Sequence, residues 1–160
     1  MNGFGELTRD GLRLERTLEA PVEDVWSALT RPDSLARWLD PADFEPRVGG
    51  VVTIHFDDGS VDGRILAYDP PTVLEYTWRI QGEPETVLRF ELEPVGDSTR
   101  LVLLHRGLPA NQETGYAAGW HAHLDRLAAL GTGEAIDWAE RFGELRPRYA
   151  DRSSQRSGAW

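Results

Sequence analysis

The chain has 160 residues, enough for one sizeable hydrophobic core but too few for two comfortable domains. It contains neither cysteine nor lysine, which excludes disulfides, cysteine metal sites, P-loop phosphate binding and Schiff-base chemistry. The net charge is −10 and no basic run interrupts it, so nucleic acid and anionic membranes are disfavoured as partners.

The ends and the overall composition suggest a simple organisation. No stretch approaches the ~20 consecutive apolar residues of a membrane helix, and the first residues lack the basic and apolar regions of a signal peptide. We therefore expect a cytoplasmic protein. We find no internal repeat, and we expect a single domain over residues 1–150 followed by a frayed polar tail over residues 151–160.

The first predicted elements are a strand and two short helices. Residues 11–20 alternate apolar and charged side chains, as a half-buried strand does, although the alternation slips once before Leu18. Pro21 stands where a helix tolerates proline, in its first turn, and the apolar residues after it recur at helical spacing until Pro32. A second short amphipathic segment follows and ends at Pro41.

The middle of the chain is rich in β-branched and aromatic residues, and short turn motifs divide it into runs. Short connections of this kind favour an antiparallel meander over βαβ units. The runs are 51–57, 61–68, 72–80, 86–93 and 99–106.

The last third of the chain returns to a helical period. Residues 112–130 predict a long helix whose apolar stripe contains Tyr116, Trp120, His123 and Leu127. The apolar residues after Gly133 predict a further short helix. The element order therefore indicates an α+β fold.

Several sequence motifs in this order resemble the SRPBCC or START-like superfamily, in particular its branch named after the activator of the ninety-kilodalton heat-shock-protein ATPase. The resemblance covers roughly residues 10–130. The matching segments are APVEDVW at 20–26, LARW at 35–38, Gly49-Gly50, Asp58-Gly59, Gly63, Pro70-Pro71, LEYTW at 74–78, TRLVLLH at 99–105, Gly107-Leu108-Pro109, Gly119-Trp120 and LDRL at 124–127.

This resemblance implies the helix-grip fold, in which a curved antiparallel sheet of about six strands surrounds a long C-terminal helix, with two short helices after the first strand. It also implies a cavity between the sheet and that helix. Members of such families use the cavity for lipids, sterols, polyketides, hormones or aromatic metabolites. We therefore expect a START-like ligand-binding domain.

Strand alternation and helical spacing assign the residues that face this cavity. Each single ring could instead be ordinary core, since a large inward side chain usually just fills volume. As a group they predict an apolar ligand site. The predicted ligand-binding residues are Trp26, Trp38, Phe44, Tyr76, Trp78, Phe90, Leu101, Leu103, His105, Tyr116, Trp120, His123 and Leu127.

The leading hypothesis is a binding or carrier domain for a small hydrophobic or aromatic ligand, without cofactor or metal. His121 and Asp125 have ligand spacing, but we expect them on an outward flank of the helix. One alternative is a cyclase, dehydratase or hydrolase-type enzyme in which His105, His123 or Tyr76 moves protons.

Another alternative is a chaperone-regulating or other protein-interaction module with an exposed apolar patch. Four residues of the last segment are the candidates for such a patch: Trp138, Phe142, Tyr149 and Trp160. The sequence also allows a homodimer, formed through the outer sheet face or this C-terminal segment.

Overall fold

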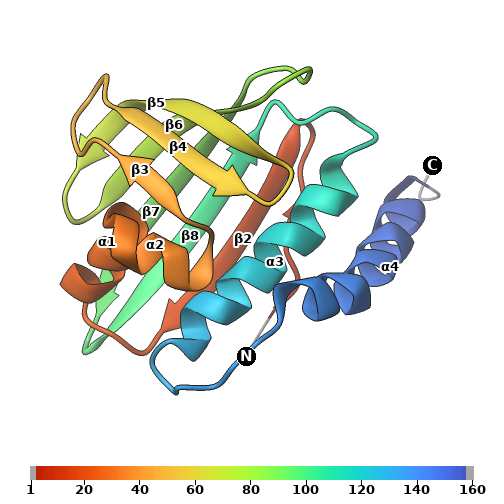
Figure 1. Ribbon diagram of the computed structural model, residues 1–160. Coiled ribbons are helices and arrows are strands. Elements are labelled where there is room, and N and C mark those ends of the chain that lie inside the picture. The colour runs from red at the N-terminus through yellow and green to blue at the C-terminus, as the bar shows by residue number, and fades with distance from the viewer. Residues whose placement is uncertain (1–2, 158–160) are drawn as a thin grey trace.

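The computed structural model describes residues 3–157, with side chains over residues 3–152. Its strands form one antiparallel sheet in the order β1-β2-β8-β7-β6-β5-β4-β3 (Figure 1). Two short strands, β1 and β3, extend the six predicted ones. The strands are β1 (Glu6–Leu7), β2 (Gly11–Leu18), β3 (Ala42–Phe44), β4 (Val51–Phe56), β5 (Gly59–Asp69), β6 (Val73–Ile80), β7 (Thr86–Val95) and β8 (Ser98–Arg106).

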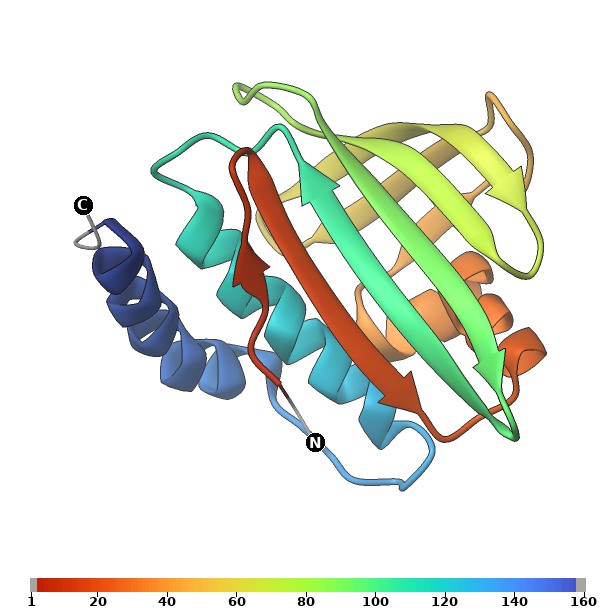
Figure 2. The same cartoon turned by 180° about the vertical axis from the view of Figure 1, so that it is seen from behind.

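Four helices occur among the described residues: α1 (Val22–Thr30), α2 (Pro32–Trp38), α3 (Glu113–Ala129) and α4 (Trp138–Ser157). The curved sheet surrounds α3, and Figure 2 shows that its opposite face carries no helix within the described chain. This confirms the predicted α+β arrangement. No helix between residues 3 and 157 is long and apolar enough to cross a membrane.

The last helix differs from the sequence prediction. We expected a short helix and a polar tail from residue 151, whereas α4 has 20 residues and continues to Ser157. It packs along α3, near the edge of the sheet that β1 forms (Figures 1 and 2). Because of this packing, α3 is buried on two sides, and small residues such as Ala117, Ala118 and Ala122 are fully buried between its neighbours.

Strand β2 keeps a strict alternation, so the predicted slip is wrong. Leu14, Arg16 and Leu18 all occupy inward positions and pair with β8 in continuous register. Arg16 is only 4% exposed. When strand faces are assigned from hydrophobicity alone, a charged residue at an inward position looks like a break in the alternation.

Close backbone approach between β5 and β6 explains one glycine of the meander. A Cβ on Gly63 would collide with the backbone oxygen of Thr77 on β6. The pairing of these two strands also shifts between Ile65 and Ala67, an irregularity that bends a sheet. Glycine and bulge together let the sheet curve over α3.

The hydrophobic core lies between the concave face of the sheet and α3. Leu14, Leu74, Leu88, Leu101 and Leu103 are completely buried there. Full burial of one leucine stabilises the fold by roughly 1.5–3 kcal/mol relative to an exposed one. Beside this core, one flank of α3 from Thr114 to Arg126 lines the open space that forms the site.

Candidate functional site

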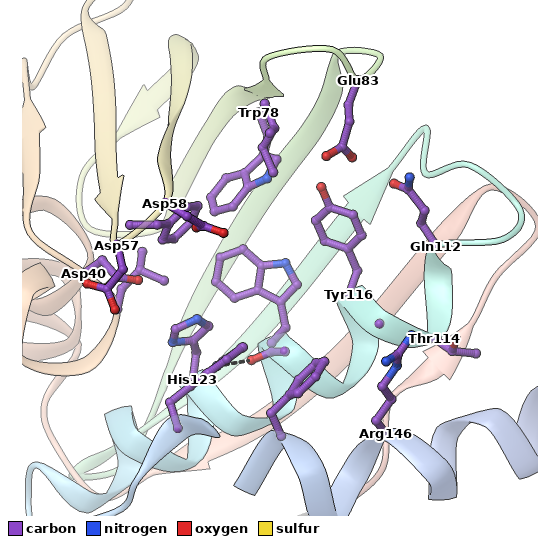
Figure 3. Close-up of a pocket in the computed structure, with 18 of the residues that line it drawn as sticks. Asp40, Asp57, Asp58, Trp78, Glu83, Gln112, Thr114, Tyr116, His123 and Arg146 are labelled. Atoms are coloured by element: carbon purple, nitrogen blue, oxygen red, sulfur yellow. Dashed lines mark hydrogen bonds between the residues drawn. The ribbon is translucent and has the colours of Figure 1, made fainter. Parts of the chain in front are cut away.

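A cleft of about 820 Å³ opens between the N-terminal half of α3, the start of α4 and the β4–β6 part of the sheet (Figure 3). We call it the aromatic cleft. Rings from four elements line it: Phe56 of β4, Trp78 of β6, Tyr116, Trp120 and His123 of α3, and Trp138 and Phe142 of α4.

Two glycines of α3 leave room for the cleft. Gly115 and Gly119 both line it, and a Cβ on Gly115 would meet no atom within 4 Å. Gly119 also serves α4, because its carbonyl oxygen accepts the indole N–H of Trp138 at 3.1 Å. At these two positions α3 therefore presents its backbone to the cavity and no side chain.

The rings are fixed by contacts with one another. Trp78 and Trp120 meet edge to face with 5.1 Å between ring centroids, and His123 lies 5.7 Å from Trp120. Trp138 and Phe142 stack at 4.8 Å. Such pairs are worth about 0.5–1.5 kcal/mol each beyond their buried area, so the cleft walls are largely pre-formed.

His105 lies beneath this wall and is locked in one neutral form. The indole of Trp120 can only donate, so Nδ1 of His105 accepts its N–H at 3.0 Å and the ring proton sits on Nε2. Nε2 then donates to the Thr86 hydroxyl at 2.7 Å, and that hydroxyl donates to the Trp78 carbonyl. Burial lowers the pKa of His105 to about 3.

His123 is the histidine that reaches the cleft. Its Nδ1 donates to the backbone carbonyl of Trp38 at 3.2 Å, which leaves the lone pair on Nε2. Burial lowers the pKa of His123 to about 3, with a smaller opposing effect from that carbonyl. The ring is therefore a neutral hydrogen-bond acceptor near pH 7.

One buried polar atom of a cleft residue has no hydrogen-bond partner: Oε1 of Gln112, an acceptor. The Tyr116 hydroxyl lies near the indole N–H of Trp78 (Figure 3). Burial, followed by the charge of Glu83, raises the pKa of Tyr116, while the interaction with Trp78 lowers it. A ligand that donates a hydrogen bond would satisfy the Gln112 oxygen.

Charged side chains surround the mouth of the cleft. Four carboxylates and two guanidinium groups contribute: Asp40, Asp57, Asp58, Glu83, Arg126 and Arg146. Burial raises the pKa of Asp40 to about 6, while Arg126 lowers it and Asp57 raises it further.

The structure divides the predicted site residues into two groups. Trp78, Tyr116, Trp120 and His123 line the cleft. The others lie in the packed core or at its edge, because the open space is displaced toward the N-terminal end of α3. This second group contains Trp26, Trp38, Phe44, Tyr76, Phe90, Leu101, Leu103, His105 and Leu127.

Several cleft residues were not predicted from the sequence. The carboxylates of the mouth stand on turns, and alternation says nothing about which turns converge. The absence of bulk at Gly115 and Gly119, one helical turn apart, was the signal that could have located the cavity on α3.

Two expectations about polar and apolar surfaces are wrong. His121 and Asp125 are not on an outward flank but fully buried under α4. The expected apolar patch is also absent from the described surface, since Tyr149 is buried and Trp138 and Phe142 face the cleft. Trp160, the fourth residue of that patch, lies outside the described residues. Within residues 3–157, no group of three or more His, Asp or Glu side chains could hold a metal ion.

Solved structures of similar fold were found for most of the chain. Protein MLL2253 from Mesorhizobium loti is 31% identical with a TM-score of 0.71, covering 78% of this chain and 98% of its own. CalU16 from Micromonospora echinospora is 25% identical with a TM-score of 0.75, covering 94% of each chain. The Aha1 dimer from Colwellia psychrerythraea is 20% identical with a TM-score of 0.67, covering 73% of this chain and 92% of its own, a likeness of fold alone.

No curated protein matches the sequence. A family model described as "Activator of Hsp90 ATPase homolog 1-like protein" matches residues 19–132, which run from the residue after β2 to just beyond α3. That segment contains the meander and the face of α3 that together form the floor of the cleft. The chain therefore belongs to the family of activator of Hsp90 ATPase homolog 1-like proteins.

Proposed function

We propose that this chain is a binding or carrier domain for a small hydrophobic or aromatic ligand held in the aromatic cleft. The observation that supports it most is a cleft of about 820 Å³ walled by rings from four elements. Ligand sites of proteins are typically concave, mostly apolar and supplied with a few polar groups, as this cleft is by Gln112 Oε1 and the Tyr116 hydroxyl.

A cavity-filling variant tests this proposal. Gly115→Leu places a side chain into the open space, and leucine favours a helix over glycine by up to ~1 kcal/mol, so the fold should not suffer. Gly143→Leu is the matched control, because Gly143 lies on α4 with equally open surroundings and does not line the cleft.

The measurement is a thermal-shift screen with a panel of aromatic and lipid metabolites. A ligand present at 100 times its Kd stabilises the fold by about 2.7 kcal/mol. We expect hits with the wild type and the Gly143 variant and none with the Gly115 variant. If no compound stabilises the wild type, or if both variants respond equally, the cleft is not the ligand site.

The geometry favours binding over proton transfer. In the described part of the chain, none of His105, His123 and Tyr76 is hydrogen-bonded to a carboxylate that would orient it. Burial also keeps both imidazoles neutral and weakly basic. A protein-interaction role loses its predicted surface among the described residues, since Tyr149 is buried and Trp138 and Phe142 line the cleft.

A homodimer stays a prediction from the sequence. The Colwellia protein is a dimer, but at 20% identity it shows a shared fold only. Sedimentation velocity across a range of protein concentrations would test the prediction, and a single species of monomer mass would contradict it.

A further inference from the structure

The charged side chains at the mouth of the aromatic cleft differ in the partners that they contact. Among residues 3–152, Asp57, Asp58 and Glu83 form no ion pair closer than 4.0 Å. The guanidinium of Arg126 is already held, since its Nη2 donates to the Arg37 carbonyl at 3.1 Å. That of Arg146 lies 6.0 Å from the centre of the Phe142 ring. With four carboxylates against two guanidinium groups, the formal charge of the residues at the mouth is negative.

The carboxylates are also grouped in space. Figure 3 shows Asp40, Asp57 and Asp58 together on one side of the cleft and Arg146 on the other. Asp40 and Asp57 act on each other, because the charge of Asp57 contributes to the raised pKa of Asp40. Three acidic groups therefore face the cleft from one side with Arg126 as their described counter-charge.

The aromatic walls of the cleft also attract positive charge. The face of an indole or phenol ring is negative and stabilises a cation placed over it by about 0.5–2 kcal/mol. Trp78, Trp120 and Tyr116 provide such rings, and Oε1 of Gln112 is a buried acceptor without a donor. The acidic rim, the π faces and the open acceptor each favour a positively charged or hydrogen-bond-donating group, with the three aspartates on one side of the cleft and Gln112 on the other (Figure 3).

We propose that the ligand of the aromatic cleft is cationic, an apolar or aromatic compound that carries an amine or ammonium group. Its apolar part packs against Trp138 and Phe142, and its positive group lies toward Asp40, Asp57 and Asp58. A carboxylate ligand meets like charge at the rim and in the field of a chain with a net charge of −10. This inference rests on the proposed binding function and narrows it to one ligand class.

Three probes that share one ring system separate charge from shape: naphthylmethylamine, naphthylmethanol and naphthylacetate. Calorimetric titration near neutral pH compares the cation, the neutral alcohol and the anion. We expect the amine to bind at least about 10-fold more tightly than the alcohol, as cation–π and rim attraction together predict, and the anion most weakly. Added salt should reduce the difference, because the rim is exposed.

The variant Asp57→Asn with Asp58→Asn removes two rim charges and keeps a turn that asparagine before Gly59 tolerates. We expect it to weaken amine binding about 3- to 10-fold and to leave alcohol binding unchanged. Asp97→Asn, on the exposed turn between β7 and β8, is the matched control and should change neither.

The outcomes separate this inference from the function beneath it. If the alcohol binds as tightly as the amine, or the anion binds best, the cationic class is overturned while the binding function stands. If the double variant binds the amine as tightly as the control does, the rim has no part in recognition and the inference fails. If none of the three probes binds, the cationic class fails, and the thermal-shift screen decides separately whether the binding function stands.

Discussion

Tyr149 of α4 holds two other parts of the chain with one hydroxyl group. Its oxygen accepts the backbone N–H of Gly5 at 2.8 Å, and it lies 2.7 Å from Nδ1 of His121 on α3. The Nε2 atom of the same imidazole lies 3.8 Å from a carboxylate oxygen of Asp125. One buried side chain thus fastens α4 to both α3 and the N-terminal segment.

Removing this hydroxyl should loosen α4. Tyr149→Phe keeps the ring but leaves a buried amide and a buried imidazole nitrogen without partners, so we expect a loss of about 2 kcal/mol in the free energy of unfolding. Urea denaturation measures it. Tyr68→Phe is the control, since the described contact of Tyr68 is a ring contact with Trp26. Equal losses in the two variants would contradict the role given to the hydroxyl.

The buried charges beneath α4 should respond unequally to substitution. Asp125 accepts Nε of Arg141 at 2.7 Å, whereas Nε and Nη2 of buried Arg16 have no partner. Burial lowers the pKa of Arg16, and Asp125 opposes that shift. Asp125→Ala leaves two cations uncompensated and should cost roughly 3–5 kcal/mol, while Arg16→Met should cost less than about 1 kcal/mol.

Chemical denaturation of both variants checks this order. A more damaging Arg16 substitution would mean that water or another group satisfies its guanidinium, and that the arginine contributes to stability in its own right.

Three buried histidines should make the fold sensitive to acid. Burial lowers the pKa of His105 and His123 to about 3 and that of His121 to about 4. An unfolded chain binds these protons near pH 6.5. Stability is therefore complete above about 6.5 and falls as the pH decreases toward 4, by up to ~1.4 kcal/mol per pH unit for each ring.

Unfolding free energies measured between pH 7 and pH 5 test this dependence. His105→Gln removes one of the three rings and should reduce the slope by about a third, whatever its effect on absolute stability. An unchanged slope would show that His105 takes up its proton in the native state.

Ionisation of Asp40 makes the stability of the fold depend on pH in the opposite direction. The pKa of Asp40 is raised to about 6, so the folded state resists ionisation and stability falls as the pH rises from about 4 to 6. Asp40→Asn removes this penalty and should stabilise the fold near pH 7 by about 1 kcal/mol, after allowance for solvent screening of a partly exposed group. The gain should vanish near pH 4.

Thermal or urea unfolding at both pH values measures this difference, with Asp97→Asn as a control of equal charge change. A gain of the same size at pH 4 would assign it to something other than ionisation of Asp40.

The sequence predicted features that depend on local pattern. Period-two alternation placed Leu74, Tyr76 and Trp78 on the buried face of β6, and the structure confirms their burial. Alternation failed at Arg16, because hydrophobicity alone does not reveal a charged residue at an inward position. Helical spacing likewise could not show that α4 covers His121, since that burial depends on a second helix and not on α3 itself.

The site was less predictable than the fold for the same reason. Trp78 and Trp120 belong to regular elements whose faces a periodicity defines. Asp40, Asp57 and Glu83 lie outside the helices and strands, and the curved sheet brings their loops to the rim of one cleft. The curvature of the sheet depends on many strands together, so it cannot be predicted from the sequence of any one segment.

Two parts of the cleft come from different stretches of the chain, because α4 follows the segment that forms the floor. The floor comes from the segment that matches the family model, residues 19–132, whereas Trp138, Phe142 and Arg146 follow that segment. Under the proposed binding function, substitutions at these three positions should alter the size and charge of the ligand that fits the cleft, since none of them lies on a strand. Exchanging Trp138, Phe142 and Arg146, with Arg141 kept as the partner of Asp125 and Leu145 kept in the core, is therefore the direct way to test whether this helix sets the selectivity of the proposed ligand site.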